Sequence, residues 1–136
     1  MDGLFEQTFP ASAEALAGLR TEVRAACQQA GCDEECAGQV VLAVNEACMN
    51  IIQHGYAFAE GGRFTLRLAK DDRVVVIHLL DNGRAVLDAD LRPRDFDALR
   101  PGGLGVSFMR ELMDDVSYQP PPPGFTNCLQ LRKRIC

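Results

Sequence analysis

The hydrophobic positions repeat with a helical period in the first third of the chain. They predict a first helix with an N-cap at Ser12 and an end at Ala30-Gly31. One face of this helix is apolar and consists of Leu16, Leu19, Val23 and Ala26 or Cys27. Asp33 is predicted to cap a second helix that runs to about His54. Gly55 suits the left-handed position just past the end of that helix.

Shorter segments alternate in polarity or are rich in β-branched residues, which is typical of strands. They predict strands over residues 4–9, 64–68, 74–81, 116–118 and 128–132, and a third helix over 103–114. The order of elements predicts an α+β fold, a two-layer sandwich with helices on one face of a mixed, mainly antiparallel sheet. We expect a single domain, 1–136, in which the long polar segment at about 84–103 forms a lid.

Composition narrows the classes of function. With 136 residues, 47% of them hydrophobic, the chain can form one ordinary core. The net charge of -5 argues against nucleic-acid binding, which usually needs clustered Lys and Arg. No apolar run approaches the roughly 20 residues that cross a bilayer, and residues 1–6 lack the features of a signal peptide. We therefore expect a cytoplasmic protein without a membrane partner.

The six cysteines permit two interpretations. Cys27, Cys32 and Cys36 are close in sequence and suggest a metal site. However, they lack a second Cys/His pair at zinc-finger spacing. The interpretation as small buried or surface thiols is favoured, because several cysteines fall at apolar positions and a reducing compartment keeps them reduced.

A polar stripe runs along the apolar second helix. Glu46, Asn50 and His54 are spaced at i, i+4 and i+8, so they share one face. Leaving a buried carboxylate or amide unpaired costs about 1–3 kcal/mol. Either a neighbouring element satisfies these groups, or a ligand does. A metal-bound phosphate suits both, with the amide oxygen on the metal and the carboxylate left as a base.

A second candidate is Asp81, which ends the β-branched strand. Alternation places it on the same side as Val75, Ile77 and Leu79, the face that should meet the helices. A buried carboxylate there could accept a hydrogen bond from an adenine amino group. Alternatively, Asp81 bonds its own turn, as Asp-Asn-Gly sequences often do.

A third candidate is the glycine-rich segment 100–105, which runs into the third helix. Glycines let a backbone pass close to phosphates, and a helix N-terminus offers free N–H groups. Arg92, Arg94 and Arg100 could add positive charge. A flexible glycine linker is the alternative, because a glycine-rich loop alone is weak evidence.

Together the three candidates resemble the N, G1 and G2 boxes of the GHKL ATP-binding superfamily. The boxes are Glu46-x3-Asn50-x3-His54-Gly55-Tyr56, Asp81-x-Gly83 and Gly102-Gly103-Leu104-Gly105-Val106. The chain is most similar to the small anti-sigma factor serine/threonine-protein kinases. The end of the chain also fits that branch, with Gly124-x2-Asn127-x-Leu129-x-Leu131-x-Lys133.

The resemblance implies ATP and Mg²⁺ as cofactors. Asn50 would bind Mg²⁺ through its side-chain oxygen, and Asp81 would accept a hydrogen bond from adenine. Gly83 would let the turn approach the base, and Glu46 would be the catalytic base for a protein serine hydroxyl. The phosphates would lie against Gly103, Leu104 and Gly105. From the last strand, Thr126 or Asn127 would contact the nucleotide.

The resemblance also implies partners, namely a STAS-type anti-anti-sigma protein as substrate and a sigma factor or similar target that is sequestered. A non-catalytic, nucleotide-binding switch that captures partners stoichiometrically is the alternative function. A detached histidine-kinase domain is disfavoured because the chain lacks room for a phosphoacceptor helix. Val74, Val76, His78 and Leu80 predict an apolar outer sheet face, and hence a homodimer or partner interface there.

Overall fold

The computed structural model describes residues 2–85 and 103–135, with the side chains of 2 and 103–107 left out. Its elements are β1 (Asp2–Pro10), η1 (Ala13–Ala15), α1 (Leu16–Ala30), α2 (Glu34–Asn50), η2 (Ile51–Gly55), β2 (Arg63–Asp71), β3 (Val74–Asp81), α4 (Gly103–Leu112), β4 (Asp115–Gln119) and β5 (Asn127–Arg134). Most of the predicted lid, 84–103, lies outside the described residues. Within the described part of the chain, no helix is long and apolar enough to cross a membrane.

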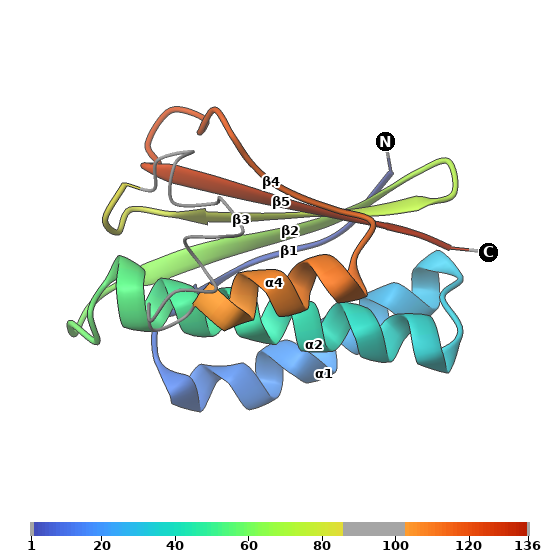
Figure 1. The fold of residues 1–136 in the computed structure, drawn as a ribbon, viewed down its shortest axis with the longest axis horizontal. Helices are drawn as coiled ribbons and strands as arrows, with labels where there is room; N and C mark the ends of the chain where they lie inside the picture. The colour runs from blue at the N-terminus through green and yellow to red at the C-terminus, as the bar shows by residue number, and fades with distance from the viewer. Residues whose placement is uncertain (1, 86–102, 136) are drawn as a thin grey trace.

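The strands form a five-stranded sheet in the order β1-β2-β3-β5-β4. The helices α1, α2 and α4 all cover one face of it (Figure 1). This confirms the predicted α+β two-layer sandwich. The sheet differs in one detail from the mixed sheet we expected, because all four pairings among the described strands are antiparallel.

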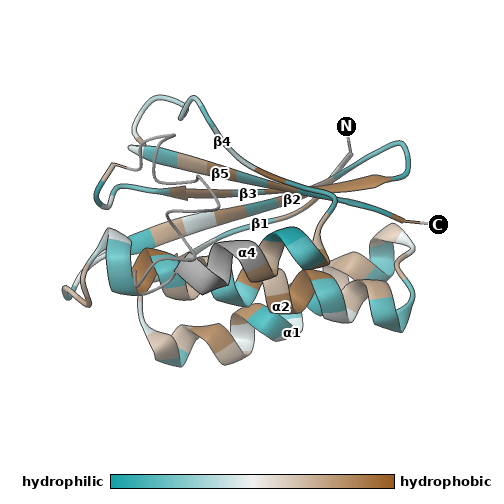
Figure 2. Ribbon diagram, viewed as in Figure 1, coloured by the Kyte–Doolittle hydropathy of each residue, from teal (hydrophilic) through white to brown (hydrophobic). Residues whose placement is uncertain are grey.

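The core lies between the sheet and the helices. Val75, Ile77 and Leu79 of β3 are fully buried in it, as their alternation predicts. Near the sheet edge, the ring of Phe9 stacks on that of Phe64, with centroids 5.8 Å apart. Figure 2 shows mainly hydrophobic residues along β3, whereas hydrophobic and hydrophilic residues alternate along the helices and the β2–β3 turn is hydrophilic.

The turn between α1 and α2 forms as the sequence predicts. Gly31 closes α1 in the left-handed conformation with φ 104°. Asp33 caps α2, its carboxylate accepting a hydrogen bond from the Cys36 amide at 2.8 Å.

Ser12 precedes the short 3-10 turn η1, and its side chain makes no capping bond.

The end of the second helix differs from the prediction. Residues Ile51–Gly55 form a π-helical turn, in which the Tyr56 amide bonds to the carbonyl of Ile51. Gly55 is therefore not the left-handed residue that we expected. That conformation occurs two residues later, at Ala57 and Phe58, with φ of 51° and 62°.

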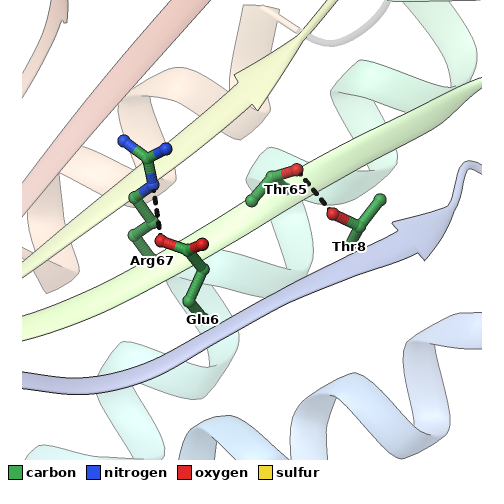
Figure 3. A network of polar contacts seen from close by, with 4 residues as sticks. All are labelled: Glu6, Thr8, Thr65 and Arg67. Carbon is green, nitrogen blue, oxygen red and sulfur yellow. Dashed lines mark hydrogen bonds and ion pairs between the residues drawn. The ribbon is translucent and has the colours of Figure 1, made fainter.

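The sheet face away from the helices is less apolar than predicted. Val76 and Leu80 do lie there, but each is only 1% exposed, since neighbouring side chains already cover them. Polar pairs occupy the adjoining strands: Arg67 forms an ion pair with Glu6 at 2.8 Å, and Thr8 shares a hydrogen bond with Thr65 at 2.8 Å (Figure 3). The predicted homodimer or partner interface on this face stays a prediction.

Candidate functional site

Asp81 ends β3 with its carboxylate turned into the protein. It is 5% exposed, and its Oδ1 accepts hydrogen bonds from the Gly83 amide (2.8 Å) and from Asn127 Nδ2 (3.0 Å). Burial raises the pKa of this carboxyl group, and the bonds from Asn127 and Gly83 only partly oppose the rise. The interpretation that Asp81 bonds its own turn is confirmed, and the interpretation that it accepts a hydrogen bond from adenine stays a prediction. Asp81 bonds its own turn through Oδ1, while Oδ2 accepts no hydrogen bond from any described residue.

The turn after Asp81 lies directly against the end of the second helix. An added Cβ on Gly83 would lie 2.6 Å from the carbonyl oxygen of Gly55, a distance that no real side chain tolerates. The same carbonyl accepts a hydrogen bond from the Arg84 amide at 2.8 Å. Glycine is therefore required at position 83 so that two backbone segments can touch.

Tyr56 joins three segments near this turn. Its hydroxyl donates to the carbonyl of Arg63 at 2.6 Å and accepts from the Asn82 amide at 2.8 Å. The helix end, the start of β2 and the turn after β3 are thus held at one point. A tyrosine at position 56 has a positioning role that its place in the motif did not reveal.

Glu46 and Asn50 lie half-buried on α2. Neither side chain makes a hydrogen bond or ion pair with another described residue. Nearby, Arg20 of α1 donates to the side-chain oxygen of Asn45 at 3.0 Å. Of the two alternatives for this stripe, the described residues give no support to a seam that a neighbouring element satisfies. Within residues 2–85 and 103–135, the carboxylate of Glu46 and the amide oxygen of Asn50 therefore have no partner that would compete with a ligand.

His54 follows on the same helix, within the π-helical turn. Its Nε2 atom is buried and has no hydrogen-bond partner among the described residues. The residue itself is half-buried at the end of the second helix. The unpaired nitrogen lies next to Gly55, in a helix segment of a kind often found at functional sites.

The remaining predicted residues are placed only in part. Gly103, Leu104 and Gly105 form the first turn of α4, so this helix begins at the glycine-rich segment as predicted. The residues from 86 to 102, including the candidate arginines at 92, 94 and 100, lie outside the described residues. On the other side of the site, the Thr126 amide donates to the backbone carbonyl of Asp81 at 2.9 Å.

These elements meet at one end of the molecule. In Figure 1 the end of α2 with η2, the end of β3, the start of β5 and the start of α4 all lie at the same end. The fold therefore brings together a helix N-terminus, the buried carboxylate of Asp81, and a carboxylate and an amide that no described residue pairs. Such a set is suited to a purine nucleotide with its phosphates and a divalent cation.

Asn127 is the site residue that the sequence indicated least. Its Nδ2 donates to Asp81 and also to the carbonyl of Arg84 at 2.9 Å, so one amide ties β5 to the turn after β3. The signal in the sequence was an asparagine at the start of an otherwise apolar strand. A polar residue there, 5% exposed, needs partners inside the protein.

The comparisons with known proteins agree with this geometry. The family model of the histidine kinase-like ATPase domain matches residues 9–133, and the chain belongs to this family. The serine-protein kinase RsbW of Bacillus subtilis (strain 168) is 31% identical over 84% of this chain and 76% of its own length. RsbW of Bacillus pumilus (strain SAFR-032) is 32% identical over 85% of this chain and 78% of its own.

Two further matches extend the comparison. The serine/threonine-protein kinase BtrW of Bordetella bronchiseptica is 34% identical over 59% of each chain. A solved structure, the RsbU and RsbW domains of Rv1364c from Mycobacterium tuberculosis, superimposes with a TM-score of 0.69 at 20% identity. It covers 96% of this chain, which spans 31% of that longer one, and it supports the fold alone. The resemblance to the anti-sigma factor serine kinases is confirmed at the level of the family.

Proposed function

We propose that this protein is an ATP- and Mg²⁺-dependent protein serine/threonine kinase. Its substrate would be a STAS-type anti-anti-sigma protein, and it would sequester a sigma factor or a similar regulatory target. The observation that carries the proposal is the pair Glu46 and Asn50. Both are half-buried on one face of α2, without a partner among the described residues, toward the end of the helix that continues into η2.

The nucleotide would be held from several sides. Asp81 would accept the adenine amino group at Oδ2, since Oδ1 already binds Asn127 and Gly83. Asn50 would hold Mg²⁺ through its side-chain oxygen, and the ion would neutralise phosphate charge. One amide ligand is sufficient, because Mg²⁺ keeps several waters in such sites. Gly103, Leu104 and Gly105 would lie against the phosphates, Thr126 would contact the nucleotide from the opposite side, and the segment 84–103 would act as the lid.

In the transfer step, Glu46 would act as the base. It would accept the proton of the substrate serine hydroxyl while that oxygen attacks the γ-phosphorus and the bond to ADP breaks. Phosphoryl transfer relies mainly on positioning and charge stabilisation, so a single aligned carboxylate is the acid–base group that the chain would contribute. Glu46 lies one helical turn before Asn50, which would set the hydroxyl beside the metal-bound phosphates.

Transfer of label from γ-³²P-ATP to a STAS protein encoded near this gene tests the activity. We expect Glu46→Gln to bind ATP within about threefold of wild type and to lose at least about a hundredfold in transfer rate, as removal of a general base typically does. Asn50→Ala should lose both Mg²⁺-dependent binding and transfer. If Glu46→Gln still captures the partner and wild type transfers no label, the protein is a stoichiometric switch instead of a kinase.

We also propose a homodimer through the outer sheet face. Because Val76 and Leu80 are already covered, the hydrophobic gain per area would be modest, and polar rows such as Arg67–Glu6 would fix the register. Light scattering over 1–100 μM tests this. A monomer throughout that range would contradict the dimer and leave the kinase proposal untouched.

A further inference from the structure

The turn between α1 and α2 brings cysteines together through its backbone. The Cys32 amide donates to the carbonyl of Cys27 at 3.0 Å, and the Gly31 amide donates to Gln28 at 3.1 Å. This pair of bonds is the Schellman motif, in which the side chains of its first and last residues contact each other. Usually two apolar side chains make that contact. Here two cysteines occupy those positions, and the neighbouring Cys32 thiol acts to lower the pKa of Cys27.

The cap of α2 adds a third thiol. Cys32 immediately precedes Asp33, whose carboxylate binds the Cys36 amide and turns the first helical turn back toward it. The Cys32 and Cys36 thiols also affect each other, since Cys32 acts to raise the pKa of Cys36. Cys32 therefore lies between the other two in the chain and acts on the pKa of both. We define Cys27, Cys32 and Cys36 as the thiol cluster.

Access to the thiol cluster is graded. Cys27 is 0% exposed and Cys32 is 8% exposed, whereas Cys36 is half-buried. Cys36 also lines a pocket of about 230 Å³ between the start of α2 and the end of β5. Asp33, Glu35, Lys133 and Arg134 surround that pocket. A small molecule entering from solvent would meet the sulfur of Cys36 first.

We propose that the thiol cluster is a thiol–disulfide exchange site for low-molecular-weight disulfides, with Cys36 as the entry thiol and Cys32 as the resolving thiol. The Cys36 thiolate attacks one sulfur of a disulfide RSSR and releases RS⁻. The Cys32 thiolate then attacks the Cys36 sulfur and releases a second RS⁻. Two protons and two electrons pass from the protein to RSSR, which leaves as two RSH, and a Cys32–Cys36 disulfide remains.

A metal is not the occupant that the geometry favours. Among the described residues, no group of three His, Cys, Asp or Glu is arranged to hold a metal ion. The proposed site is also separate from the predicted kinase site. Cys36 and Asn50 lie toward opposite ends of α2, roughly 21 Å apart at about 1.5 Å per helical residue.

The surroundings make this exchange slow at neutral pH. Burial raises the pKa of Cys36 to about 12, the Cys32 thiol and the charge of Asp33 act in the same direction, and Lys133 opposes them. Glu35 and Arg134 complete the charged groups around the pocket, and Arg24 acts on Cys27 from α1. Because the thiolate is the nucleophile, the rate should rise about tenfold per pH unit. The site would thus respond to sustained oxidation and not to brief exposure.

The test uses the full chain with hydroxyethyl disulfide at pH 8.5, followed by alkylation and intact-mass measurement. We expect wild type to lose two alkylatable thiols. Cleavage after glutamate at Glu34 and Glu35 separates Cys32 from Cys36 in the sequence, so a disulfide between them would hold the two peptides together until reduction. A persistent mixed disulfide in wild type, or no reaction at Cys36, would overturn the proposal.

Variants assign the roles. In Cys32→Ala the exchange reaction should stop at a mixed disulfide on Cys36. In Cys36→Ser, Cys32 should stay unmodified. Cys27→Ala should still form the link, because its thiol takes no part in the exchange; a link lost in this folded variant would contradict the pairing. Cys128→Ser is the matched control, since Cys128 is also nearly buried, at 5% exposed, but lies on the outer sheet face. It should behave as wild type, and thermal melts under reducing conditions verify that each variant is folded.

Discussion

The side-chain amide of Asn127 donates a hydrogen bond of 3.0 Å to Oδ1 of Asp81 across the β3–β5 pair. The two residues are partners in the strand register, one at the end of its strand and the other at the start. This bond fixes the carboxylate of Asp81 to the neighbouring strand β5. A ligand that binds Oδ2 would therefore meet a group whose position is already fixed, which reduces the cost of ordering on binding.

Replacing Asn127 with alanine removes the hydrogen bonds from its side chain to Asp81 and to the carbonyl of Arg84. We expect a loss of about 2–3 kcal/mol in the free energy of unfolding, because a buried carboxylate loses a partner. Nucleotide affinity should fall at least about tenfold in calorimetry. The control is Gln130→Ala on the same strand, which removes the bond to His78 on the outer face. It should change stability by less and leave nucleotide affinity unchanged; equal loss of affinity in both variants would contradict a specific role for Asn127.

Asp81→Asn separates binding from stability. The pKa of Asp81 is raised in the folded protein because burial disfavours the charged form. The folded state then holds the proton more tightly than the unfolded state, so the free energy of unfolding falls as pH rises from the ordinary carboxyl pKa through the raised one. Above the raised pKa, the free-energy cost of burying the charged carboxylate is fully present. Asp81→Asn should lack this part of the pH dependence.

Urea unfolding from pH 3.5 to 7.5 measures the difference between the two proteins. The wild-type curve should fall relative to that of Asp81→Asn with rising pH and then run parallel to it. A wild-type curve that rises relative to the variant would show a lowered pKa and contradict the burial argument. At neutral pH the variant should also lose nucleotide binding by about a hundredfold, since an amide presents a donor where the adenine amino group needs an acceptor, as in other sites built to hydrogen-bond their ligand.

Patterns that depend on side-chain period carried most of the correct predictions. The strict alternation of β3 placed Asp81 on the helix-facing side, and the spacing of four residues placed Glu46 and Asn50 on one face of α2. Capping by Asp33 and closure at Gly31 also followed from local chemistry. These features depend on neighbours in sequence, so a single chain is enough to predict them.

Two kinds of feature were not predicted: an irregular turn of a helix, and burial or hydrogen bonds that depend on residues distant in sequence. The π-helical turn at Ile51–Gly55 cannot be read from a pattern of period 3.6, and it moved the left-handed residues to Ala57 and Phe58. Similarly, an alternation pattern shows that Val76 and Leu80 face outward but not that neighbouring side chains cover them. The bond from Asn127 to Asp81 joins positions 46 residues apart.

Gly83→Ala tests the close contact of the site turn with the helix end. The added Cβ would lie 2.6 Å from the Gly55 carbonyl oxygen, so one of the two backbone segments must move. We expect a destabilisation of about 1–3 kcal/mol, the usual cost of overpacking, and a loss of nucleotide affinity as the Asp81 turn shifts. Gly38→Ala is the control, because nothing lies within 4 Å of its added Cβ. Inside α2, that change should stabilise by about 0.5–1 kcal/mol.

Tyr56→Phe tests whether the hydroxyl that joins three segments matters for the site. Removing it breaks the bonds to the Arg63 carbonyl and the Asn82 amide, both at exposed positions where water can replace them. The stability loss should therefore be modest, about 1 kcal/mol. The turn after Asp81 would lose one of its fixed points, so nucleotide affinity should fall about three- to tenfold.

The matched control for Tyr56→Phe is Thr8→Val, which removes a comparable hydroxyl bond to Thr65 on the outer sheet face. Its stability loss should be similar, and its nucleotide affinity should equal that of wild type. If both variants lose nucleotide affinity in proportion to their loss of stability, then a general destabilisation of the fold explains the lower affinity. If only Tyr56→Phe loses affinity, the hydroxyl acts through Asn82 on the position of the neighbouring Asp81, because Thr8→Val leaves the bond to Asn82 intact.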